Sequence, residues 1–329
     1  MTVAVTGSIA NDYLMTFPGR FSELIVPEQI GRLSLSFLVD RLEVRRGGVA
    51  ANICFGMAQL GLRPVLVAAV GQDFGDYRSW LERHGVDTDS VHVSELKHTA
   101  RFLCTTDLDQ SQIASFYAGA MEEARHIELA PVAGRLGHID LIVVSPNDPA
   151  AMVRHTEEAR RAGIPFVADP SQQLASMSGH DIRVLVDGAD YLVTNDYERS
   201  LLQGKTGWGD AEVLARVGVR VTTLGERGCV VEQAGEADIA VPAVPSASVL
   251  DPTGVGDAFR AGFLTGRLWG LTLERAAQLG CALATLVLES VGTQEYTVEP
   301  DSFLARFASS YGQQAAADVA AYLPTEPDP

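Results

Sequence analysis

Basic residues are scarce in this chain. Its 329 residues include 25 Lys and Arg but 42 Asp and Glu, which gives a formal net charge of −17 at pH 7. Such a deficit of positive charge argues against a surface that binds nucleic acid or an anionic membrane. It does not argue against ATP, because a phosphate site needs only local backbone amides and a metal ion.

Cysteines and long apolar runs are also few. The four cysteines, Cys54, Cys104, Cys229 and Cys281, have neither a zinc-ligand spacing nor the pattern of a disulfide framework. No apolar run approaches the roughly 18 residues of a transmembrane helix. The first residues, MTVAVTGSIAND, lack the basic start and apolar core of a signal peptide. We therefore expect a cytoplasmic protein with reduced cysteines.

Apolar residues are plentiful, at 47% of the chain, and occur in short runs that alternate with helical segments. Strands that are apolar on both faces and alternate with helices indicate an α/β fold with a mostly parallel sheet covered by helices. The predicted strands are residues 3–5, 65–70, 141–145, 165–168, 191–194, 219–223 and 230–231. The predicted helices are residues 50–60, 148–162, 212–216, 255–268 and 273–289.

Small or polar residues directly follow several of these strands, namely Gly7, Asp169, Asn195 and Gly225. Ligands of a parallel sheet bind beyond the carboxyl ends of its strands. We therefore expect these residues to crowd one edge of the sheet.

Three stretches alternate with period two instead: residues 33–37 and parts of 101–106 and 112–116. This pattern predicts half-exposed strands, and the turn at residues 107–111 indicates that the last two form a hairpin. A small extra sheet that acts as a lid and an ordinary edge hairpin explain the pattern about equally well.

The domain prediction is a single domain of residues 1–312, with the lid at about 12–46 and 97–118 inserted in it. The tail, residues 313–329, carries only an Ala-rich turn and ends in PTEPDP, so we expect it to be frayed.

The segment Asp251-Pro-Thr-Gly-Val-Gly-Asp257 leads into the predicted helix of residues 255–268. Gly254 and Gly256 lie where a tight turn would enter that helix, and free amides there form an anion site. Asp257 is unexpected, because a carboxylate in the first turn competes with a bound phosphate. It either takes a proton from an attacking hydroxyl, as in a small-molecule kinase, or merely stabilises the helix dipole. The motif alone favours neither interpretation.

Three further motifs each have a plain structural explanation as well. In Gly47-Gly48-Val-Ala-Ala-Asn52, the two glycines either let a ligand approach the backbone closely or belong to a simple loop-to-helix junction. Asn195-Asp-Tyr-Glu198 suits a metal site or a helix capping box. Thr223-Leu-Gly-Glu-Arg-Gly228 is a glycine-spaced loop that carries little information by itself.

Gly204-Lys-Thr206 matches the end of a Walker A loop, which also requires glycine five positions before Gly204. Residue 199 is arginine. We interpret this tripeptide as a solvated loop, so any ATP would be bound without a P-loop.

In their order along the chain these motifs carry a resemblance. Over roughly residues 1–310 the chain resembles the ribokinase-like (PfkB) carbohydrate and nucleoside kinase family, and within it the adenosine kinases of the actinobacterial type. The resemblance implies a doubly wound sheet with a β lid, and ATP-dependent phosphorylation of the 5′-hydroxyl of adenosine to AMP, in purine salvage. One departure is Val255, where the family usually has alanine or another small residue; we expect little consequence.

The resemblance also implies roles by position. Asp257 would be the base, and the amides of Gly254, Val255 and Gly256 would be the anion hole. The triphosphate and its Mg²⁺ would lie near Asn195 and Glu198, and the nucleotide beside Thr223, Gly225 and Gly228. The ribose hydroxyls would be held by Asp12, Gly48 and Asn52. A monovalent cation such as K⁺ would lie beside Asp251, Thr253, Ser290 and Gly292.

The acceptor is the open question within this family. A purine needs flat apolar walls, and Phe102 and Phe116 lie on the two predicted lid strands. Gln172 and Gln173 can pair with a purine edge, and the resemblance adds Ser8. Alternatively, both phenylalanines only fill the apolar face of the lid. We favour adenosine over a free sugar, with a non-catalytic nucleoside-binding protein as a third hypothesis.

The lid also suggests the assembly. Leu33, Leu35 and Phe37 would lie on one side of a protruding strand and would need covering. We therefore predict a homodimer through the lid sheets.

Overall fold

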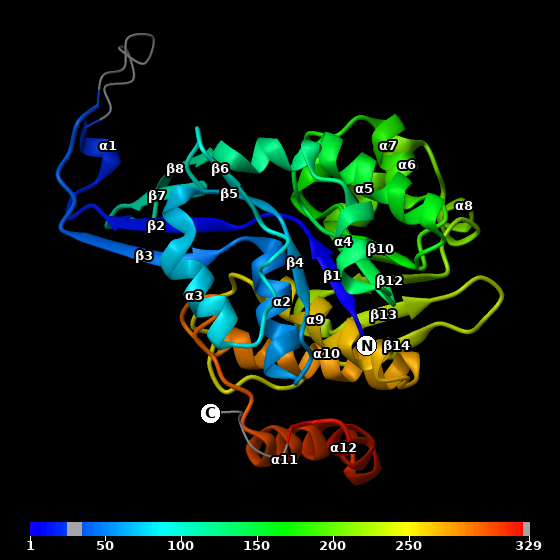
Figure 1. The fold of residues 1–329 in the computed structure, drawn as a ribbon. Helices are drawn as coiled ribbons and strands as arrows, with labels where there is room; N and C mark the ends of the chain where they lie inside the picture. The colour runs from blue at the N-terminus through cyan, green and yellow to red at the C-terminus, as the bar shows by residue number, and fades with distance from the viewer. Residues whose placement is uncertain (25–34, 325–329) are drawn as a thin grey trace.

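The computed structural model describes residues 1–24 and 35–324, and its main sheet has the strand order β14-β13-β12-β11-β10-β9-β1-β4 (Figure 1). Strands β12 to β4 in this order run parallel, whereas β13 and β14 are antiparallel. The bounds are β1 Val3–Thr6, β4 Val65–Val67, β9 Leu141–Val144, β10 Phe166–Ala168, β11 Tyr191–Asn195, β12 Val219–Thr223, β13 Cys229–Glu232 and β14 Ile239–Val241.

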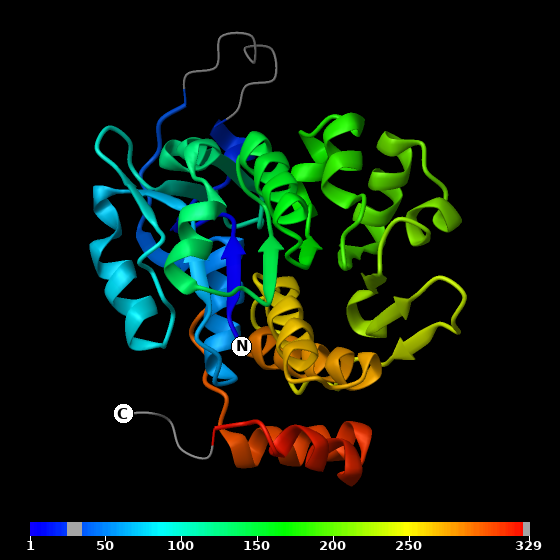
Figure 2. The ribbon, with the colours of Figure 1, turned by 45° about the vertical axis from the view of Figure 1, so that its right-hand side comes forward.

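Helices cover both faces of this sheet, as Figures 1 and 2 show. The fold is therefore the mostly parallel α/β class that the sequence predicted. On one face lie α4 Leu129–Leu136, α5 Pro149–Ala162, α6 Gly179–Val186 and α7 Asp196–Thr206, with the short α8 Asp210–Leu214 nearby. On the other lie α2 Val49–Gln59, α9 Val255–Leu268 and α10 Leu273–Leu288, followed outward by α11 Pro300–Tyr311 and α12 Gln313–Ala320.

The lid is a separate sheet in the order β3-β2-β7-β8. Its strands are β2 Ala10–Thr16, β3 Arg41–Gly47, β7 Ala100–Thr106 and β8 Gln112–Tyr117, and the short helix α1 Phe21–Leu24 follows β2. Because β2 starts soon after β1 ends at Thr6, the lid stands at the carboxyl end of the main sheet. The predicted hairpin is confirmed by the antiparallel pairing of β7 with β8.

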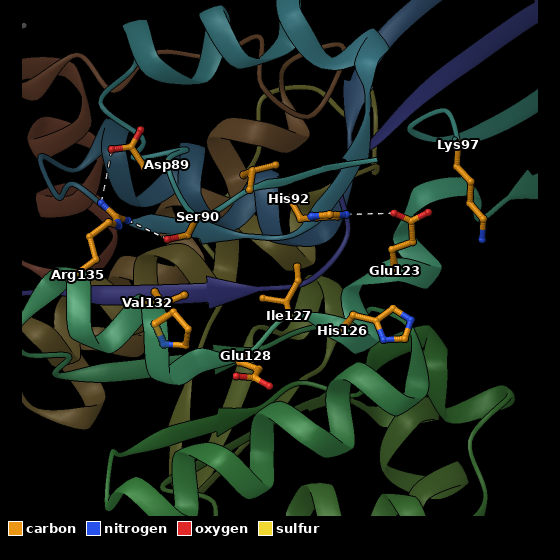
Figure 3. A pocket seen from close by; sticks show the side chains of 12 residues that line it. Asp89, Ser90, His92, Lys97, Glu123, His126, Ile127, Glu128, Val132 and Arg135 are labelled. Atoms are coloured by element: carbon orange, nitrogen blue, oxygen red, sulfur yellow. Dashed lines mark hydrogen bonds and ion pairs between the residues drawn. The ribbon is translucent and has the colours of Figure 1, made fainter. Parts of the chain in front are cut away.

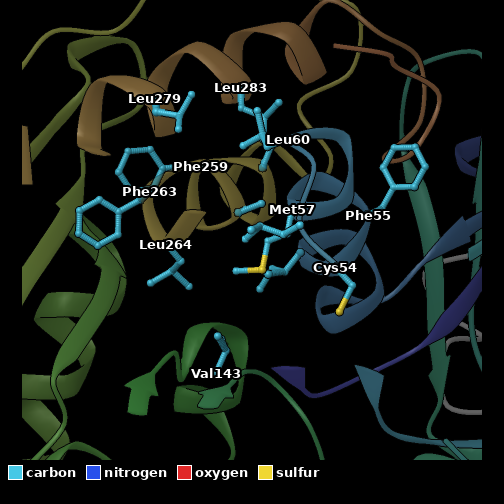
Figure 4. Close-up of a cluster of buried hydrophobic side chains, with 14 of the residues drawn as sticks. Cys54, Phe55, Met57, Leu60, Val143, Phe259, Phe263, Leu264, Leu279 and Leu283 are labelled. Atoms are coloured by element: carbon cyan, nitrogen blue, oxygen red, sulfur yellow. The ribbon is translucent and has the colours of Figure 1, made fainter. Parts of the chain in front are cut away.

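The packing of α2 against α9 brings two helix N-termini together under the lid. Phe55 and Met57 of α2 belong to the same core cluster as Phe259 and Phe263 of α9, with Leu283 of α10 behind them (Figure 4). All of these side chains are buried. The helices start at Val49 and Val255, so their first turns meet near the carboxyl end of β1.

Most predicted elements of the main sheet are confirmed. The strands agree within one residue at each end, and the helix of residues 255–268 coincides with α9. The prediction of a single strand at residues 65–70 is wrong: β4 ends at Val67, and β5 Ala69–Gly71 leaves the sheet to pair with β6 His92–Ser94. After β6 the chain returns to the lid, and α3 Gly75–Arg83 lies between β5 and β6.

Three other predictions need correction. Residues 35–37 form no strand, because Phe37 instead packs on Phe17 and Phe21, with ring centroids 4.9 and 5.3 Å away; Leu33 lies outside the described residues. The tail is not frayed over residues 313–320, where α12 buries Ala315 and Val319 against the core. Gly204-Lys-Thr206 is the last turn of α7 and not a loop.

Candidate active site

A cavity of about 540 Å³ lies between the lid and the carboxyl end of the main sheet. Every residue that the sequence predicted to hold the acceptor lines it, together with part of the glycine-rich turn that precedes α9. The lining residues that enter the argument are Ser8, Asp12, Gly48, Asn52, Phe102, Phe116, Gln172, Gln173, Thr253, Gly254, Asp257 and Thr293.

The floor of the cavity is the turn that leads into α9. Gly254 is the N-cap of α9 with φ +78°, and a Cβ there would lie 2.9 Å from the Thr293 Cγ2 atom, so only glycine fits. Asp251 shapes the turn, since its Oδ1 atom accepts a hydrogen bond from the Thr253 amide at 2.9 Å. Among the described residues, the amides of Gly254 and Gly256 have no backbone acceptor. Such amides at a helix N-terminus attract an anion.

Val255, the departure from the family pattern, leaves this turn intact. Its side chain packs against the core cluster beneath α9. Its amide is already 3.5 Å from the Pro252 carbonyl oxygen, so it is less free to bind an anion than the neighbouring amides.

Asp257 lies in the first turn of α9, at the edge of the cavity, and faces α2. Its Oδ2 atom accepts a hydrogen bond from the Asn52 side-chain amide at 2.9 Å. Burial raises the pKa of the Asp257 carboxyl above its ordinary value, whereas the Arg260 charge and the Asn52 hydrogen bond oppose that rise. A carboxylate with a raised pKa is a better proton acceptor than an exposed aspartate.

Asn52 is oriented by residues that the sequence gave no reason to select. Its Oδ1 atom accepts a hydrogen bond from the Gln294 amide at 2.9 Å and lies equally close to the Thr293 hydroxyl. Gln294 donates its second N–H to the Tyr77 hydroxyl at 2.6 Å, which in turn donates to the Gly47 carbonyl oxygen at 2.9 Å. This buried network leaves the Asn52 NH₂ group directed at Asp257.

The start of α2 forms the side wall of the cavity. Gly48 has φ +97°, and a Cβ there would lie 2.6 Å from the Ser8 carbonyl oxygen. The Ser8 hydroxyl oxygen accepts a hydrogen bond from the Val49 amide at 3.1 Å, so the end of β1 and the start of α2 are joined. The glycine at position 48 is required by this close approach of two backbones.

The lid contributes acid and aromatic side chains. In register, Asp12 is paired with Phe102 of β7, which is paired with Phe116 of β8, so the three form a row above the cavity. Burial, together with the nearby Asp251 charge, raises the pKa of Asp12 to about 6, and the Arg45 charge opposes this rise. Phe116 is about half exposed.

Gln172 and Gln173 follow β10 on the opposite wall, where their carboxamides are held by serines. The Ser176 hydroxyl donates to Gln173 Oε1 at 2.6 Å, and the Ser171 hydroxyl lies 2.8 Å from Gln172 Oε1. Each carboxamide thus keeps its NH₂ group as a donor. Ser171, directly before Gln172, has φ +42°, a strained conformation for a non-glycine residue.

The residues predicted to border the nucleotide lie outside this cavity but beside one another. Asn195 and Thr223 end neighbouring strands and are paired in register, and the tight turn from Gly225 to Gly228 follows directly. The capping box is present: Asn195 Oδ1 accepts from the Glu198 amide and Glu198 Oε2 accepts from the Asn195 amide, both at 2.8 Å. Glu198 therefore has a structural role, with only Oε1 left, near the Ser171 hydroxyl at 3.2 Å.

The predicted monovalent-cation residues also come together. Asp251 Oδ2 accepts a hydrogen bond from the Gly292 amide at 3.1 Å and lies 3.4 Å from Arg45 Nη1. The Ser290 hydroxyl donates to the Leu286 carbonyl oxygen at 3.1 Å. The Asp251 carboxylate is thus already satisfied, and a cation beside it would have to use backbone carbonyls.

No group of three or more His, Cys, Asp or Glu side chains within residues 1–24 and 35–324 could hold a metal ion by itself. Mg²⁺ usually binds through one or two carboxylates and the phosphates of a substrate. The single remaining oxygen of Glu198 is compatible with that mode. In the same ranges, none of the helices has the length and apolar character needed to cross a bilayer.

A second, larger hollow lies on the surface between β6 and α4 (Figure 3). Four of its ionisable side chains pair with one another, His92 with Glu123 at 3.1 Å and Arg135 with Asp89 at 3.7 Å. Lys97 and Glu128 pair with Glu122 and Arg154, which lie outside the hollow. This hollow contains no glycine-rich turn, and each of its carboxylates is engaged in an ion pair. We therefore do not regard it as the active site.

Comparisons with known proteins show which family the chain resembles. The pfkB family carbohydrate kinase pattern matches residues 12–300. A nucleoside kinase of Methanothermobacter thermautotrophicus is 30% identical over 298 residues, which cover 89% of this chain and 94% of the relative. The structure of Burkholderia thailandensis nucleoside kinase in complex with inosine is 34% identical, covers 94% of this chain and 99% of that chain, and has a TM-score of 0.83. A complex of the same enzyme with ADP-inosine is 36% identical with a TM-score of 0.80.

The match extends through the lid, the glycine-rich turn and α9, and the fold of the solved relatives is the ribokinase-like fold expected from the motifs. The chain belongs to the pfkB family of carbohydrate kinases.

Proposed function

We propose that this kinase transfers the γ-phosphoryl group of ATP to the 5′-hydroxyl of adenosine, giving AMP for purine salvage. The observation that carries the proposal is the Asp257 carboxylate, held at 2.9 Å by Asn52, beside the free amides of the turn before α9. A base and an anion site thus meet on the floor of one cavity. The aromatic row of the lid lies on its other side.

In this proposal the chain positions the reactants and neutralises charge, which phosphoryl transfer chiefly requires. Asp257 takes the proton of the hydroxyl as its oxygen attacks phosphorus, and ADP leaves. The amides of the turn, with Gly254 and Gly256 the freer donors, stabilise the negative charge that develops on the transferred group. Asp12, Gly48 and Asn52 hold the ribose.

The nucleotide is proposed to lie along Asn195, Thr223, Gly225 and Gly228, next to this cavity. When bound, Mg²⁺ would neutralise phosphate charge, and Glu198 would be the acidic side chain that helps to hold it. A monovalent cation such as K⁺ is proposed beside the turn of Asp251 and Thr253, with Ser290 and Gly292 across from it. Comparing rates in K⁺ and Na⁺ tests that part.

The acceptor assignment depends on the lid. Phe102 and Phe116 provide flat apolar walls, and Gln172 and Gln173 present N–H donors to the edge of a base. Relatives described as nucleoside kinases support a nucleoside over a free sugar. The second candidate is a sugar kinase, because the matched family is described as one of carbohydrate kinases. A panel of adenosine, inosine, ribose and fructose with Mg-ATP tests the choice: equal or better turnover of a sugar would reject adenosine.

Replacing Phe102 by alanine should separate these substrates. Stacking of a base on an aromatic ring contributes ~1–3 kcal/mol, so kcat/KM for adenosine should fall about 5- to 150-fold. Use of a free sugar should barely change. Steady-state kinetics of Phe102→Ala measure this, with Phe102→Tyr as the variant that keeps a flat ring. Leu108→Ala truncates an exposed lid residue of the β7–β8 turn and should have no effect. Equal losses for sugar and nucleoside would contradict a base-stacking role.

The homodimer is proposed through the lid face that points away from the cavity. Of the residues from which the dimer was predicted, Leu33 lies outside the described residues and Phe37 packs within its own chain. The apolar surface for the dimer is therefore formed by other residues of the lid. In register, Tyr13 is paired with Val44, and Met15 with Leu42, on the face opposite Asp12 and Phe102. Leu42 and Val44 are each 55% exposed. A sheet face of this kind on a monomer would be an aggregation hazard, and the same face of a second copy would cover it.

Val44→Asp should therefore convert the dimer into monomers. Light scattering should give twice the 35.2 kDa mass of one chain for the wild type and the single mass for the variant. Val93→Asp, an exposed valine on β6 away from the lid, is the matched control and should stay dimeric. A monomeric wild type at micromolar concentration would contradict the proposal.

A further inference from the structure

A buried arginine lies directly beneath the glycine-rich turn. Arg260 follows Asp257 on α9 and is only 6% exposed. Burying a charged side chain is costly unless it is paired. The Arg260 Nε atom lies 2.7 Å from Oδ1 of Asp169, which is fully buried at the end of β10. The N–H does not point at that oxygen, so the contact is an ion pair and not an aligned hydrogen bond.

The other end of the same guanidinium lies against the turn itself. A Cβ placed on Gly256 would be 2.8 Å from Arg260 Nη1. Glycine at position 256 therefore leaves room for the guanidinium beside a backbone amide that has no backbone acceptor among the described residues. The Arg260 side chain thus links the end of β10, through Asp169, to the start of α9.

The surroundings of Arg260 are acidic. Besides Asp169, its charge acts on Asp257 of the same helix and on Glu198 of α7. Among the described groups that interact with the Asp257 carboxyl, Arg260 is the cation, Glu198 and Asp169 are the anions, and Asn52 is the neutral hydrogen-bond donor. Tyr296, before α11, is a further buried titratable group that Asp257 affects. Without Arg260 the carboxylates would face one another uncompensated.

We propose that Arg260, anchored by Asp169, is a positioning residue for phosphoryl transfer: it supports the turn of residues 254–256 from behind and places a positive charge beside Asp257. The inference rests on the proposed role of Asp257 as base, and it adds Asp169 and Arg260 to the residues on which the reaction depends. Neither residue touches the cavity. Their effect is exerted through Asp257 and through the backbone of Gly256.

Arg260→Gln removes the charge and keeps a polar side chain. An opposite charge within a few ångströms lowers the pKa of an aspartate by ~1–3, so losing it should move the acidic limb of kcat/KM upward by about one pH unit or more. The fall in rate should be largest at acidic pH and partly recovered at alkaline pH. A purely structural defect would lower the rate by the same factor at every pH, and that parallel profile would overturn the proposal.

Two further variants keep the test decisive even where Arg260→Gln does not fold. Arg260→Lys and Asp169→Asn both retain the positive charge, so the acidic limb should not move upward. Both loosen the link between β10 and α9, so kcat at the plateau should fall several-fold. An upward shift of the limb, or an unchanged plateau in both variants, would overturn the proposal. All measurements use whichever acceptor the wild type phosphorylates fastest, so a wrong assignment of adenosine would not affect them.

Discussion

Asp257→Asn should lower the rate of phosphorylation by about 10²- to 10⁴-fold, the range that a positioned base contributes. The asparagine has the same shape, and its Oδ1 atom can still accept the hydrogen bond from Asn52 that Asp257 accepts at 2.9 Å. The variant cannot, however, take the proton of the attacking hydroxyl. Binding of adenosine, measured by calorimetry, should therefore persist while turnover is lost.

The matched control for this variant is Asp301→Asn. Asp301 is likewise in the first turn of a helix, α11, but lies outside the cavity. If Asp257 only stabilised a helix dipole, both variants would lose a few tenths of a kcal/mol of stability and no activity. Unchanged turnover in Asp257→Asn would thus remove its role as base and favour the non-catalytic nucleoside-binding hypothesis.

The pH dependence of the wild type checks the same assignment. Because burial raises the pKa of Asp257, the base is protonated at a higher pH than an exposed aspartate would be. The acidic limb of kcat/KM should accordingly lie above the ordinary aspartate value of 3.8. The pKa of Asp12 is raised to about 6, so Asp12 also becomes protonated as the pH falls. The resulting weaker binding of the ribose should lower kcat/KM further at acidic pH.

The parts of the fold that sequence predicts well are those with unambiguous local signals. Buried parallel strands such as β9, with sequence LIVV, are apolar on both faces and therefore stand out. The start of α9 is marked by Gly254, which adopts the left-handed conformation that the turn requires. β2 and β3 have the mixed sequences ANDYLMT and RLEVRRG, and almost none of their side chains is fully buried, so no apolar pattern identifies them as strands.

The same distinction applies to the candidate site. Motif residues such as Asp257 and Asn52 could be selected, since glycine-rich neighbours mark a place where a ligand approaches the backbone. Gln294 and Tyr77 could not, because a buried glutamine and a tyrosine outside any motif have no sequence signal; only their hydrogen bonds connect them to Asn52. Arg260 carries no sequence signal either, because nothing in the sequence distinguishes a buried arginine from an exposed one on a helix.

Gly254→Ala should lower kcat by about 10²- to 10³-fold, the loss that follows removal of one donor from an anion hole. A left-handed conformation costs a non-glycine residue ~1–2 kcal/mol, and Gly254 has φ +78°. The new methyl group would also lie 2.9 Å from Thr293 Cγ2. The Thr293 hydroxyl lies 2.9 Å from Asn52 Oδ1. A displaced threonine would therefore also disturb Asn52, which donates a hydrogen bond to Asp257. Adenosine binding should change far less than turnover.

Two further variants separate backbone strain from the collision with Thr293. Gly207, the C-cap of α7, has the same left-handed conformation, with φ +72° and open space around its Cβ position, so Gly207→Ala carries a similar conformational cost and should lower the melting temperature while leaving kcat intact. Adding Thr293→Ser to Gly254→Ala removes the colliding Cγ2 atom but keeps the hydroxyl near Asn52, and part of the lost rate should return. A Gly254→Ala enzyme as fast as the wild type would mean that this turn does not hold the transferred phosphoryl group, because the amides would then have moved without consequence.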